Sequence, residues 1–509
     1  MIARMAQIHR FSKYFLILFM LISAALGMLR FNSLQLGASY DDAHYIILAE
    51  SLSSGQGYEL INFPKPQIER AFPPGWPILL TPLATFFPAD YSAFKIFTLI
   101  LWIASLPLIY ILFSKRIQSP YLEILIGLVA VNPLLVGTSV TVMSESAYLF
   151  FSLITLILFD SWNEKPNYAL VILIAFAALF TQLIRTVGIA IFIALIIYYL
   201  YSRRFREAGI TFGVFAIGAL IQFWLNLRNG GSLVSAGYES QVFSGSLIEK
   251  IGQMWSNLLG YLNETVAGSL VPIFGERVNA LVGPLIPQIL NAGILLVIIL
   301  GLSLSRKKIQ LFDVYVLIYI AGILAFWNPK VGSVKARFLI PILPFLYFYL
   351  IQGLKWLLEK ITKNNLVNTA RFTFAVTGMI AILLVARNLQ DWRSPISEQM
   401  TDLSAGADWV AENVPADAVL MVNEPVPAYV QMRRQTVGYP RALENIENYI
   451  VDQGIDYIIV SPKLQSPRSL KLDEDVVTQL LPILNGDLNK FTVVYHDSKL
   501  NITIYKFEN

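Results

Sequence analysis

Long apolar segments recur along most of this chain, and they constrain its fold more than any other feature. A helix that crosses the hydrocarbon core of a bilayer needs about 20 mostly apolar residues. Windows of this kind lie at residues 12–31, 94–114, 120–139, 145–160, 168–183, 186–202, 209–226, 284–304, 311–327, 338–357 and 372–387. Only 14% of the residues are charged, whereas soluble domains carry about 25%. The sequence therefore predicts a polytopic α-helical membrane protein with about 11 transmembrane helices.

The apolar run at residues 14–31 follows three basic residues, Arg4, Arg10 and Lys13, as the apolar run of a signal peptide would. Residues 14–31 are nevertheless long enough to span a bilayer, and no small-x-small cleavage site stands out. We therefore expect an uncleaved first helix.

Lysine and arginine accumulate in the cytoplasmic loops of membrane proteins, so their positions indicate the orientation. If the N-terminus is inside, every inner loop is basic. The inner segments then hold Arg4, Arg10, Lys13, Lys115, Arg116, Lys165, Arg203, Arg204, Arg206, Arg306, Lys307, Lys308, Lys355, Lys360, Lys363 and Arg371. The outer loops are less basic, apart from Arg185, Lys330, Lys335 and Arg337. The pattern predicts a multi-pass protein with a cytoplasmic N-terminus, and the compact loops and lack of cysteine favour a bacterial inner (plasma) membrane.

Three longer segments then lie outside the cytoplasm, at residues 32–93, 227–283 and 388–509. The last one changes composition. "DLSAGADWVAENVPADAVLMVNEP" and "ENIENYIVDQGIDYIIVSP" each predict a helix, a turn and a strand, and "FTVVYHDSKLNITIYKF" predicts a terminal hairpin. We therefore expect a membrane domain over residues 1–390 and a small α/β domain over residues 391–509 on the outer face.

Composition excludes several kinds of site. The chain has no cysteine, which rules out disulfides, iron–sulfur clusters and thiol nucleophiles. Its three histidines, His9, His44 and His496, lie far apart, which argues against a histidine-rich metal site. The net charge of +4 is small and indicates no nucleic-acid partner.

An acidic pair opens the first outer segment, in "SYDDAHYIILAESL". Ser39 can cap a helix whose first turn holds Asp41 and Asp42, where carboxylates favour the helix dipole by about 0.3–1 kcal/mol. The apolar residues that follow, up to Leu52, suit a helix lying in the membrane interface. A helix N-terminus and a catalytic site both remain compatible with this pair.

The order of motifs resembles a known family. The acidic pair is followed by "AESLSSGQGY" and then by "PPGWP" before the second spanning window. This order is similar to that of the GT-C superfamily of membrane glycosyltransferases, in particular the protein O-mannosyltransferase and aminoarabinose-transferase-like group. The resemblance covers residues 10–390.

The resemblance implies a reaction and its catalytic residue. The donor would be a sugar on a polyprenyl phosphate, and transfer to a hydroxyl would invert the anomeric centre. Asp41 would be the catalytic carboxylate, acting as general base on the acceptor hydroxyl, with Asp42 as its neighbour. General bases contribute about 10²–10⁴-fold to rate, and a leaving phosphate needs cationic groups or backbone donors.

The first outer segment departs from the family pattern at two positions. Some relatives have arginine three residues after the catalytic aspartate, where this chain has His44. Some have a basic residue directly before the Pro-Pro pair, where this chain has Phe72, with Arg70 two residues earlier. His44 is thus either an interfacial polar residue or a phosphate ligand, and Arg70 is a candidate for donor binding.

A second carboxylate follows in "TSVTVMSESAYLFF", where the family often has an acidic residue. Glu145 either belongs to a helix N-terminus capped by Ser144 or serves the reaction. In the second case it would hold the acceptor or share a divalent cation with Asp41, and oxygen ligands suit Mg²⁺ or Mn²⁺. Relatives differ in metal dependence, so no metal is assigned.

Two arginines on the outer side complete the candidate site. Arg185 interrupts an apolar run in "FTQLIRTVGIAIF", and a charge at the bilayer centre costs at least about 2.5–3.5 kcal/mol. It either snorkels, binds the donor phosphate or pairs with an acidic residue, and its R-x-x-G context is family-like. Arg337 precedes "FLIPILP", again a family-like context, and forms a basic cluster with Lys330 and Lys335. Such a cluster would neutralise a lipid phosphate, although the lysines would also suit a solvated loop at the headgroups.

Three other functions fit the sequence less well than transfer of a sugar from a lipid donor. A secondary transporter places ionisable groups at mid-membrane between two related halves, whereas here the charges gather at one face and no halves are found. A scaffold with an outer sensor domain would leave the acidic pair and the outer arginines unexplained. A polymerase or ligase of lipid-linked glycans is the nearest competitor, but such enzymes usually lack the acidic pair.

Overall fold

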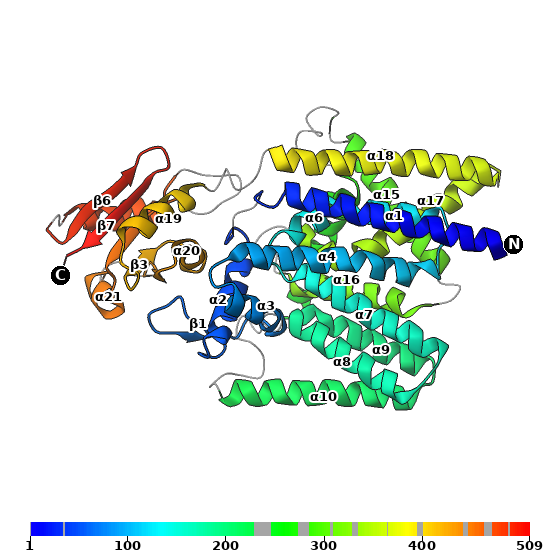
Figure 1. The fold of residues 1–509 in the computed structure, drawn as a ribbon, viewed down its shortest axis with the longest axis horizontal. Helices are drawn as coiled ribbons and strands as arrows, with labels where there is room; N and C mark the ends of the chain where they lie inside the picture. Colours follow the sequence, from blue (N-terminus) through cyan, green and yellow to red (C-terminus); the bar gives the residue numbers. More distant parts are fainter. Residues whose placement is uncertain are drawn as a thin grey trace.

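The computed structural model describes residues 2–33, 36–228, 246–272, 283, 285–305, 309–327, 334–363, 365–393, 401–440, 446–462, 471–486 and 489–508. Long helices run side by side in a bundle, and a small domain with a sheet lies at one end of it (Figure 1). The N-terminus lies at the opposite end of the bundle. The predicted cluster residue Lys330 and the basic residues 306–308 fall outside the described residues.

The bundle forms where the sequence is apolar. Each of the predicted windows coincides with a helix or with a pair of helices. These are α1 (Ile2–Leu29), α4 (Tyr91–Ser114), α5 (Tyr121–Ala130), α6 (Pro133–Ser139), α7 (Glu145–Glu164), α8 (Tyr168–Ile184), η1 (Thr186–Gly188), α9 (Ile189–Tyr201), α10 (Phe205–Arg228), α15 (Leu285–Ser305), α16 (Leu311–Phe326), η5 (Ala336–Ile342), α17 (Leu343–Ile361) and α18 (Leu366–Arg393). The break between α5 and α6 bends the chain by 50°, because Asn132 caps α6 and Pro133 begins it.

Length and composition qualify fewer helices as complete spans. Within the described residues, 5 helices are long and apolar enough to cross a membrane, or 6 if α5 and α6 form one bent span. Several others, including α8 and α9, are apolar but shorter. The count of eleven spans therefore stays a prediction.

Charged residues of the predicted inner and outer loops lie at opposite ends of the bundle. At the C-terminal ends of α4 and α7, Lys115 lies 2.5 Å from Glu164, and Arg116 lies 2.7 Å from Asp160. The distribution of lysine and arginine predicts that Lys115 and Arg116 lie in an inner loop. The acidic pair of the first outer segment lies at the other end. The structure thus separates the two predicted faces, while their orientation in the membrane stays a prediction.

The first outer segment folds over one end of the bundle. It contains α2 (Asp41–Ser53), β1 (Glu59–Leu60), β2 (Gln67–Ile68) and α3 (Gly75–Phe86) (Figure 1). The expectation that α2 lies in the membrane interface is wrong, because residues 42–49 are all buried in protein. The predicted Ser39 cap is also wrong, since Tyr40 is the N-cap residue and makes no side-chain cap bond.

In its described part, the second long outer segment contains three short helices. They are α12 (Leu247–Gly260), the π-helical turn η2 (Tyr261–Thr265) and α13 (Val266–Leu270). Residues 229–245 and 273–282 of this segment lie outside the described residues. A capping box between Ser246 and Glu249 fixes the start of α12.

The C-terminal domain contains the two helix–turn–strand units and the hairpin that the sequence predicts. Its elements are α19 (Thr401–Asn413), β3 (Val419–Val422), α20 (Pro425–Met432), β4 (Gln435–Gly438), α21 (Ile446–Gln453), β5 (Tyr457–Val460), η8 (Val476–Leu480), α22 (Leu481–Gly486), β6 (Phe491–Asp497) and β7 (Ile502–Phe507). Of these, the sequence did not predict α20, β4, η8 and α22. The strand order is β4-β3-β5-β7-β6. β3 pairs in parallel with β4 and β5, while β7 pairs antiparallel with β5 and β6. Separate apolar cores form around Met421 and Leu420, whose side chains alternate along β3.

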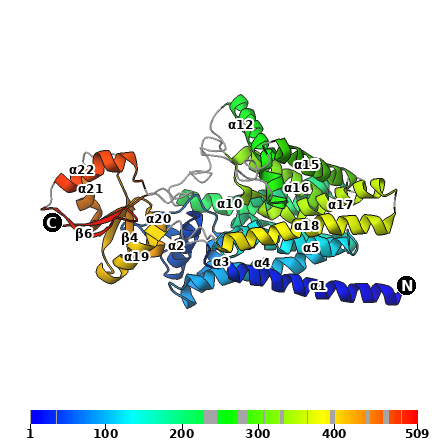
Figure 2. The same ribbon diagram turned by 90° about the horizontal axis from the view of Figure 1, so that it is seen from above.

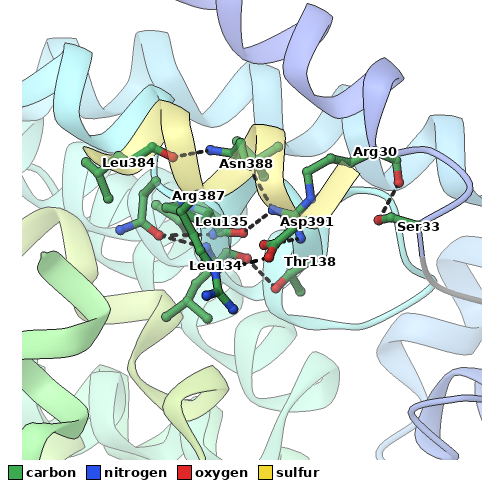
Figure 3. A network of polar contacts seen from close by, with 12 residues as sticks. Arg30, Ser33, Leu134, Leu135, Thr138, Leu384, Arg387, Asn388 and Asp391 are labelled. Carbon is green, nitrogen blue, oxygen red and sulfur yellow. Dashed lines mark hydrogen bonds and ion pairs between the residues drawn. The ribbon is translucent and has the colours of Figure 1, made fainter. Parts of the chain in front are cut away.

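A polar network ties the ends of three helices together (Figure 3). Arg30, directly after α1, donates to Pro133 O and to Asn388 Oδ1, both at 2.8 Å, and lies 3.1 Å from Asp391. Asn388 in turn donates to Val131 O at 2.9 Å. The network fixes the end of α18, which leads to the C-terminal domain, against the end of α1, which leads to α2.

Candidate active site

The first turn of α2 places Asp41 opposite an arginine from the far part of the chain. Nη2 of Arg337 donates to Oδ2 of Asp41 at 2.7 Å. Arg337 lies in η5, just before α17, and its guanidinium also lies over the Phe338 ring at 5.3 Å. The Asp41 side chain keeps 27% of its surface exposed. The carboxylate is therefore oriented by a cation and still open to a molecule that reaches this end of the bundle.

A second carboxylate–arginine pair joins the start of α7 to the end of α8. Oε1 of Glu145 lies 2.7 Å from Nη1 of Arg185, and the Glu145 side chain is fully buried. The contact is close, but its angles are not those of a hydrogen bond. The same guanidinium nitrogen donates to Ser144 Oγ at 3.0 Å, and this oxygen lies 3.1 Å from the Tyr45 hydroxyl. Because burying a lone charge is costly, this pair explains how Arg185 is accommodated in an apolar run.

The two pairs belong to one cluster. Glu145 lies close enough to Arg337 to interact with it electrostatically, and so does Arg185. Tyr45 lies one helical turn after Asp41. It also interacts electrostatically with Asp41, Glu145 and Arg185. Two carboxylates and two guanidinium groups from four separate segments thus meet beside the first turn of α2.

Asp42 faces a different environment. Only 1% of its surface is exposed, and Oδ2 accepts a hydrogen bond from the Gly37 N–H at 3.0 Å. Burial raises the pKa of Asp42 from 3.8 to about 6, against the effect of that N–H. Asp42 therefore serves the loop that leads into α2 rather than the ion-pair cluster.

The other predicted phosphate ligands have different surroundings, although His44 lies within electrostatic range of Asp41. His44 stacks on Phe72 at 4.6 Å, its Nδ1 lies 3.2 Å from Tyr40 O, and burial lowers its pKa. Lys335 is exposed, with its ammonium 5.9 Å from the Trp327 ring. Arg70 is exposed in the segment between β2 and α3. Of the predicted site residues, the structure brings together Asp41, Glu145, Arg185 and Arg337.

Comparisons by sequence and by structure differ in outcome. No protein-family model and no curated protein sequence matches this chain. ArnT from Cupriavidus metallidurans, in a crystal structure with undecaprenyl phosphate, matches with a TM-score of 0.61 and 12% identity over 96% of this chain and 97% of that chain. The oligosaccharyltransferase AglB from Archaeoglobus fulgidus, bound to an inhibitory peptide and a dolichol-phosphate, matches with a TM-score of 0.55 and 14% identity over 98% of this chain and 75% of that chain.

The arabinofuranosyltransferase AftD from Mycobacteria gives a third match, with a TM-score of 0.51 and 13% identity over 98% of this chain and 40% of that chain. All three neighbours are GT-C glycosyltransferases. The chain has the GT-C fold. The fold that the motif order predicted is thereby confirmed, and at these identities the likeness extends to the fold alone.

An apolar cavity adjoins η5. It has a volume of about 170 Å³ and lies among α12, η2, α15, α16, η5 and α17. Leu339 and Ile342 of η5, the element that carries Arg337, form part of its wall. An apolar cavity of about 150 Å³ is large enough for a benzene ring, so this one can take a section of a hydrocarbon chain.

Sequence reasoning missed the contacts that Ser144 and Tyr45 make in the ion-pair cluster. Ser144 was expected to cap α7, but its side chain makes no cap bond and instead bridges Tyr45 and Arg185. The four-residue spacing between Asp41 and Tyr45, which puts both on one helix face, was the available signal. Tyr319 was missed as well, and its hydroxyl donates to Phe338 O at 2.8 Å, next to Arg337.

A divalent cation does not suit the cluster as it stands. Asp41 and Glu145, the carboxylates that the sequence offered as ligands for Mg²⁺ or Mn²⁺, each face an arginine. A metal ion there would lie beside two guanidinium groups and meet charges of like sign. Among the described residues, no group of three or more His, Asp or Glu side chains could hold a metal. One structure of an Archaeoglobus fulgidus oligosaccharyltransferase is a complex with zinc and sulfate, whereas Asp41 and Glu145 of this chain are each paired with an arginine.

Proposed function

We propose that this chain is an inverting glycosyltransferase that moves a sugar from a polyprenyl-phosphate donor to a hydroxyl acceptor at the outer face of a membrane. The observation that carries the proposal is the ion pair between Asp41 and Arg337, beside the pair between Glu145 and Arg185. A base, and cations for a phosphate, are the groups that this transfer needs.

Asp41 is the general base in this proposal. The acceptor oxygen attacks the anomeric carbon, its proton passes to the Asp41 carboxylate, and the bond between that carbon and the phosphate oxygen breaks. The products are the glycosylated acceptor and the polyprenyl phosphate. A single displacement of this kind inverts the anomeric centre. The partial exposure of Asp41 and the burial of Asp42 favour the first residue of the pair.

The arginines would bind the donor phosphate. Guanidinium groups match the geometry of phosphate oxygens and keep their charge at all relevant pH values. Arg337 is the better placed of the two, since it is half-buried and adjoins the apolar cavity through η5. A section of the donor's hydrocarbon chain would fill that cavity. The binding of undecaprenyl phosphate by ArnT and of dolichol-phosphate by AglB supports a donor of this class.

Glu145 would hold Arg185 in place and keep the cluster from being strongly positive before the donor arrives. With Asp41 and Glu145 against two arginines, the four side chains carry no net charge. The arrival of the phosphate would draw Arg337 away from Asp41, which would leave that carboxylate free to accept a proton. The basic inner loops support the assignment of this site to the outer face.

A ligase of lipid-linked glycans is the second candidate, favoured by the likeness to the oligosaccharyltransferase AglB. The same ion-pair cluster would serve it, because the leaving group is again a lipid phosphate. The two candidates differ in the mass transferred, which is one sugar in the first and a preassembled glycan in the second.

The proposal is tested in a deletion strain complemented with the wild type, Asp41→Asn or Asp42→Asn. Mass spectrometry of lipids and glycans should show a product that depends on the wild type and is lost in Asp41→Asn at equal protein level. Asp42→Asn should keep most of it, because asparagine can still accept the Gly37 N–H bond. A full product yield from Asp41→Asn would overturn the mechanism.

A further inference from the structure

The C-terminal domain contacts the first outer segment on both sides of the acidic pair. Before α2, Gln431 Nε2 donates to Leu36 O at 2.6 Å. Gly37 adopts a φ of 87°, and a Cβ there would lie 2.8 Å from Pro427 Cβ. After α2, the Thr436 N–H donates to Asn62 O at 2.7 Å. The residues on the domain's side come from α20 and from β4, the strand that follows it.

An ion pair joins the same domain to the C-terminal half of α2. Nη1 of Arg433 lies 2.6 Å from Oε1 of Glu50, and the Tyr91 hydroxyl donates to this oxygen at 3.1 Å. The Arg433 guanidinium lies 5.6 Å from the ring centres of both Tyr91 and Tyr429. One side chain of the outer domain thus contacts α2 through Glu50 and α4 through Tyr91.

Two strained residues mark this contact. Arg433 ends α20 with a φ of 54°, and Tyr40 precedes Asp41 with a φ of 61°. Residues with a side chain rarely adopt positive φ, and for a bulky tyrosine it is an outlier. Such conformations persist where surrounding contacts hold them, and they cluster at functional sites. The strain at Tyr40 therefore indicates that the entry to α2 is held by its neighbours, which include Leu36, Gly37 and the outer domain.

We propose that Arg433 is a positioning residue, through which the outer domain holds α2 so that Asp41 faces Arg337. The role rests on the proposed function, since it concerns the reaction at Asp41. Arg433 does not reach that reaction itself. It acts through α2, whose first turn carries Asp41 and whose last turns carry Glu50.

Transfer activity and helix position can be measured in the same variants. Arg433→Ala should lower the rate of product formation by about tenfold or more, since small misplacements of catalytic groups carry costs of up to about a hundredfold. The charge exchange Glu50→Arg with Arg433→Glu should restore part of the rate. Lys490→Ala, which removes an exposed ion pair with Glu447 elsewhere in the same domain, should have no effect.

The helix position is read by spin labels, because the chain has no native cysteine. Labels at Ser54→Cys, after α2, and Lys165→Cys, at the far end of α7, give a distance by double electron–electron resonance. Arg433→Ala should broaden or shift this distance. A lower yield of correctly folded protein would by itself leave the distance unchanged. An unchanged rate or an unchanged distance would each overturn the positioning role. If the wild type forms no product, the proposed function fails, while the distance still tests the contact.

A separate inference concerns α12, whose apolar side chains point away from the protein. Ile248 is 82% exposed and Trp255 is 60% exposed, and Leu247, Ile251 and Leu259 are exposed beside them. Spacings of three and four residues place these on one face of the helix. On the opposite face of α12, the side chains of Gln253 and Asn257 each donate to Trp327 O at 2.6 Å, at the end of α16.

The helix is suited to the surface of a membrane. Its 14 residues span about 21 Å, too short for the hydrocarbon core. Figure 2 shows α12 crossing the direction of α15 and α17 instead of running along them. The exposed apolar residues Leu285 and Ile286 at the start of α15 extend the apolar surface of this end of the bundle. We infer that α12 lies in the lipid interface with its apolar face toward the hydrocarbon.

A cysteine scan tests this placement independently of any enzymatic activity. Single cysteines at positions 247–259, spin-labelled in vesicles of phosphatidylcholine and phosphatidylglycerol, are compared for relaxation by oxygen and by a water-soluble nickel chelate. Spin labels at positions 248, 251, 255 and 259 should be relaxed mainly by oxygen. A label at position 256 should be relaxed mainly by the nickel chelate. Equal access to nickel at all positions would overturn the inference.

Discussion

Arg337 and Asp41 lie 296 positions apart in the sequence, yet their side chains meet at 2.7 Å. The contact joins the first turn of α2 to η5, the short helix that directly precedes α17. A carboxylate held by a guanidinium at an exposed edge is the feature from which the proposed reaction follows.

Replacing Arg337 tests the cationic half of that contact. Arg337→Ala should lower transfer by about 100-fold or more, because it removes the group proposed to stabilise the leaving phosphate. Arg337→Lys should recover only part of the rate, since lysine offers a point charge without the planar fork. Initial rates in purified membranes measure the effect, with Lys115→Ala at the other end of the bundle as control. An Arg337→Ala enzyme within twofold of wild type would contradict the role.

The buried pair of Glu145 and Arg185 should govern stability as well as activity. Arg185→Gln leaves the fully buried Glu145 carboxylate without its cation, and breaking a buried pair in this way costs about 3–5 kcal/mol. The melting temperature in detergent should fall clearly. Adding Glu145→Gln should recover most of it, because the uncompensated charge is then gone. If the double variant melts no higher than Arg185→Gln, the charge is not the cause.

Asp42 should make stability depend on pH. Its pKa is raised to about 6 by burial, so the folded state binds this proton more tightly than the unfolded state does. The resulting stability is present below about pH 4 and is lost as the pH rises to about 6, by roughly 3 kcal/mol for a shift of about two units. Relative to wild type, Asp42→Asn should therefore gain stability between pH 5 and pH 7.5. An identical difference between the two proteins at both pH values would contradict the shift.

Two glycines should be intolerant of a methyl group. A Cβ at Gly301 would collide with Tyr349 O, and one at Gly353 would collide with Val297 O, so α15 and α17 approach each other here with their backbones. Gly301→Ala or Gly353→Ala should destabilise the protein by about 1–3 kcal/mol, the usual cost of overpacking. Gly293→Ala, also in α15, meets nothing within 4 Å and should melt at or above the wild-type temperature. Equal melting temperatures for all three variants would refute the close approach.

Local patterns accounted for much of the fold. The apolar windows marked the bundle helices, and the α/β units of the C-terminal domain followed from alternation and turn residues such as Gly454, whose φ is 64°. Family-like contexts also led to Asp41, Glu145, Arg185 and Arg337, the four residues that meet in the cluster. These signals succeed because helix and strand formation depends on residues within a few positions of one another.

Other expectations failed because burial depends on distant neighbours. The apolar residues of α2 suggested a lipid-facing stripe, but α3 and α20 cover the helix, so they face protein instead. His44 lay at a position where relatives have a basic residue, yet Phe72 packs on its ring. Apolar composition alone does not distinguish lipid from protein as the neighbour.

The sequence by itself determined which segments are helices or strands, and which charges stand at the ends of the apolar runs. Only the tertiary structure decided the partner of each charge: Arg337 with Asp41, Arg185 with Glu145, and Arg433 with Glu50 across 383 positions. The physical reason is that an ion pair requires atoms within a few ångströms, and the chain between the partners carries no signal of that distance. The packing of the bundle, with the C-terminal domain held against α2, sets it.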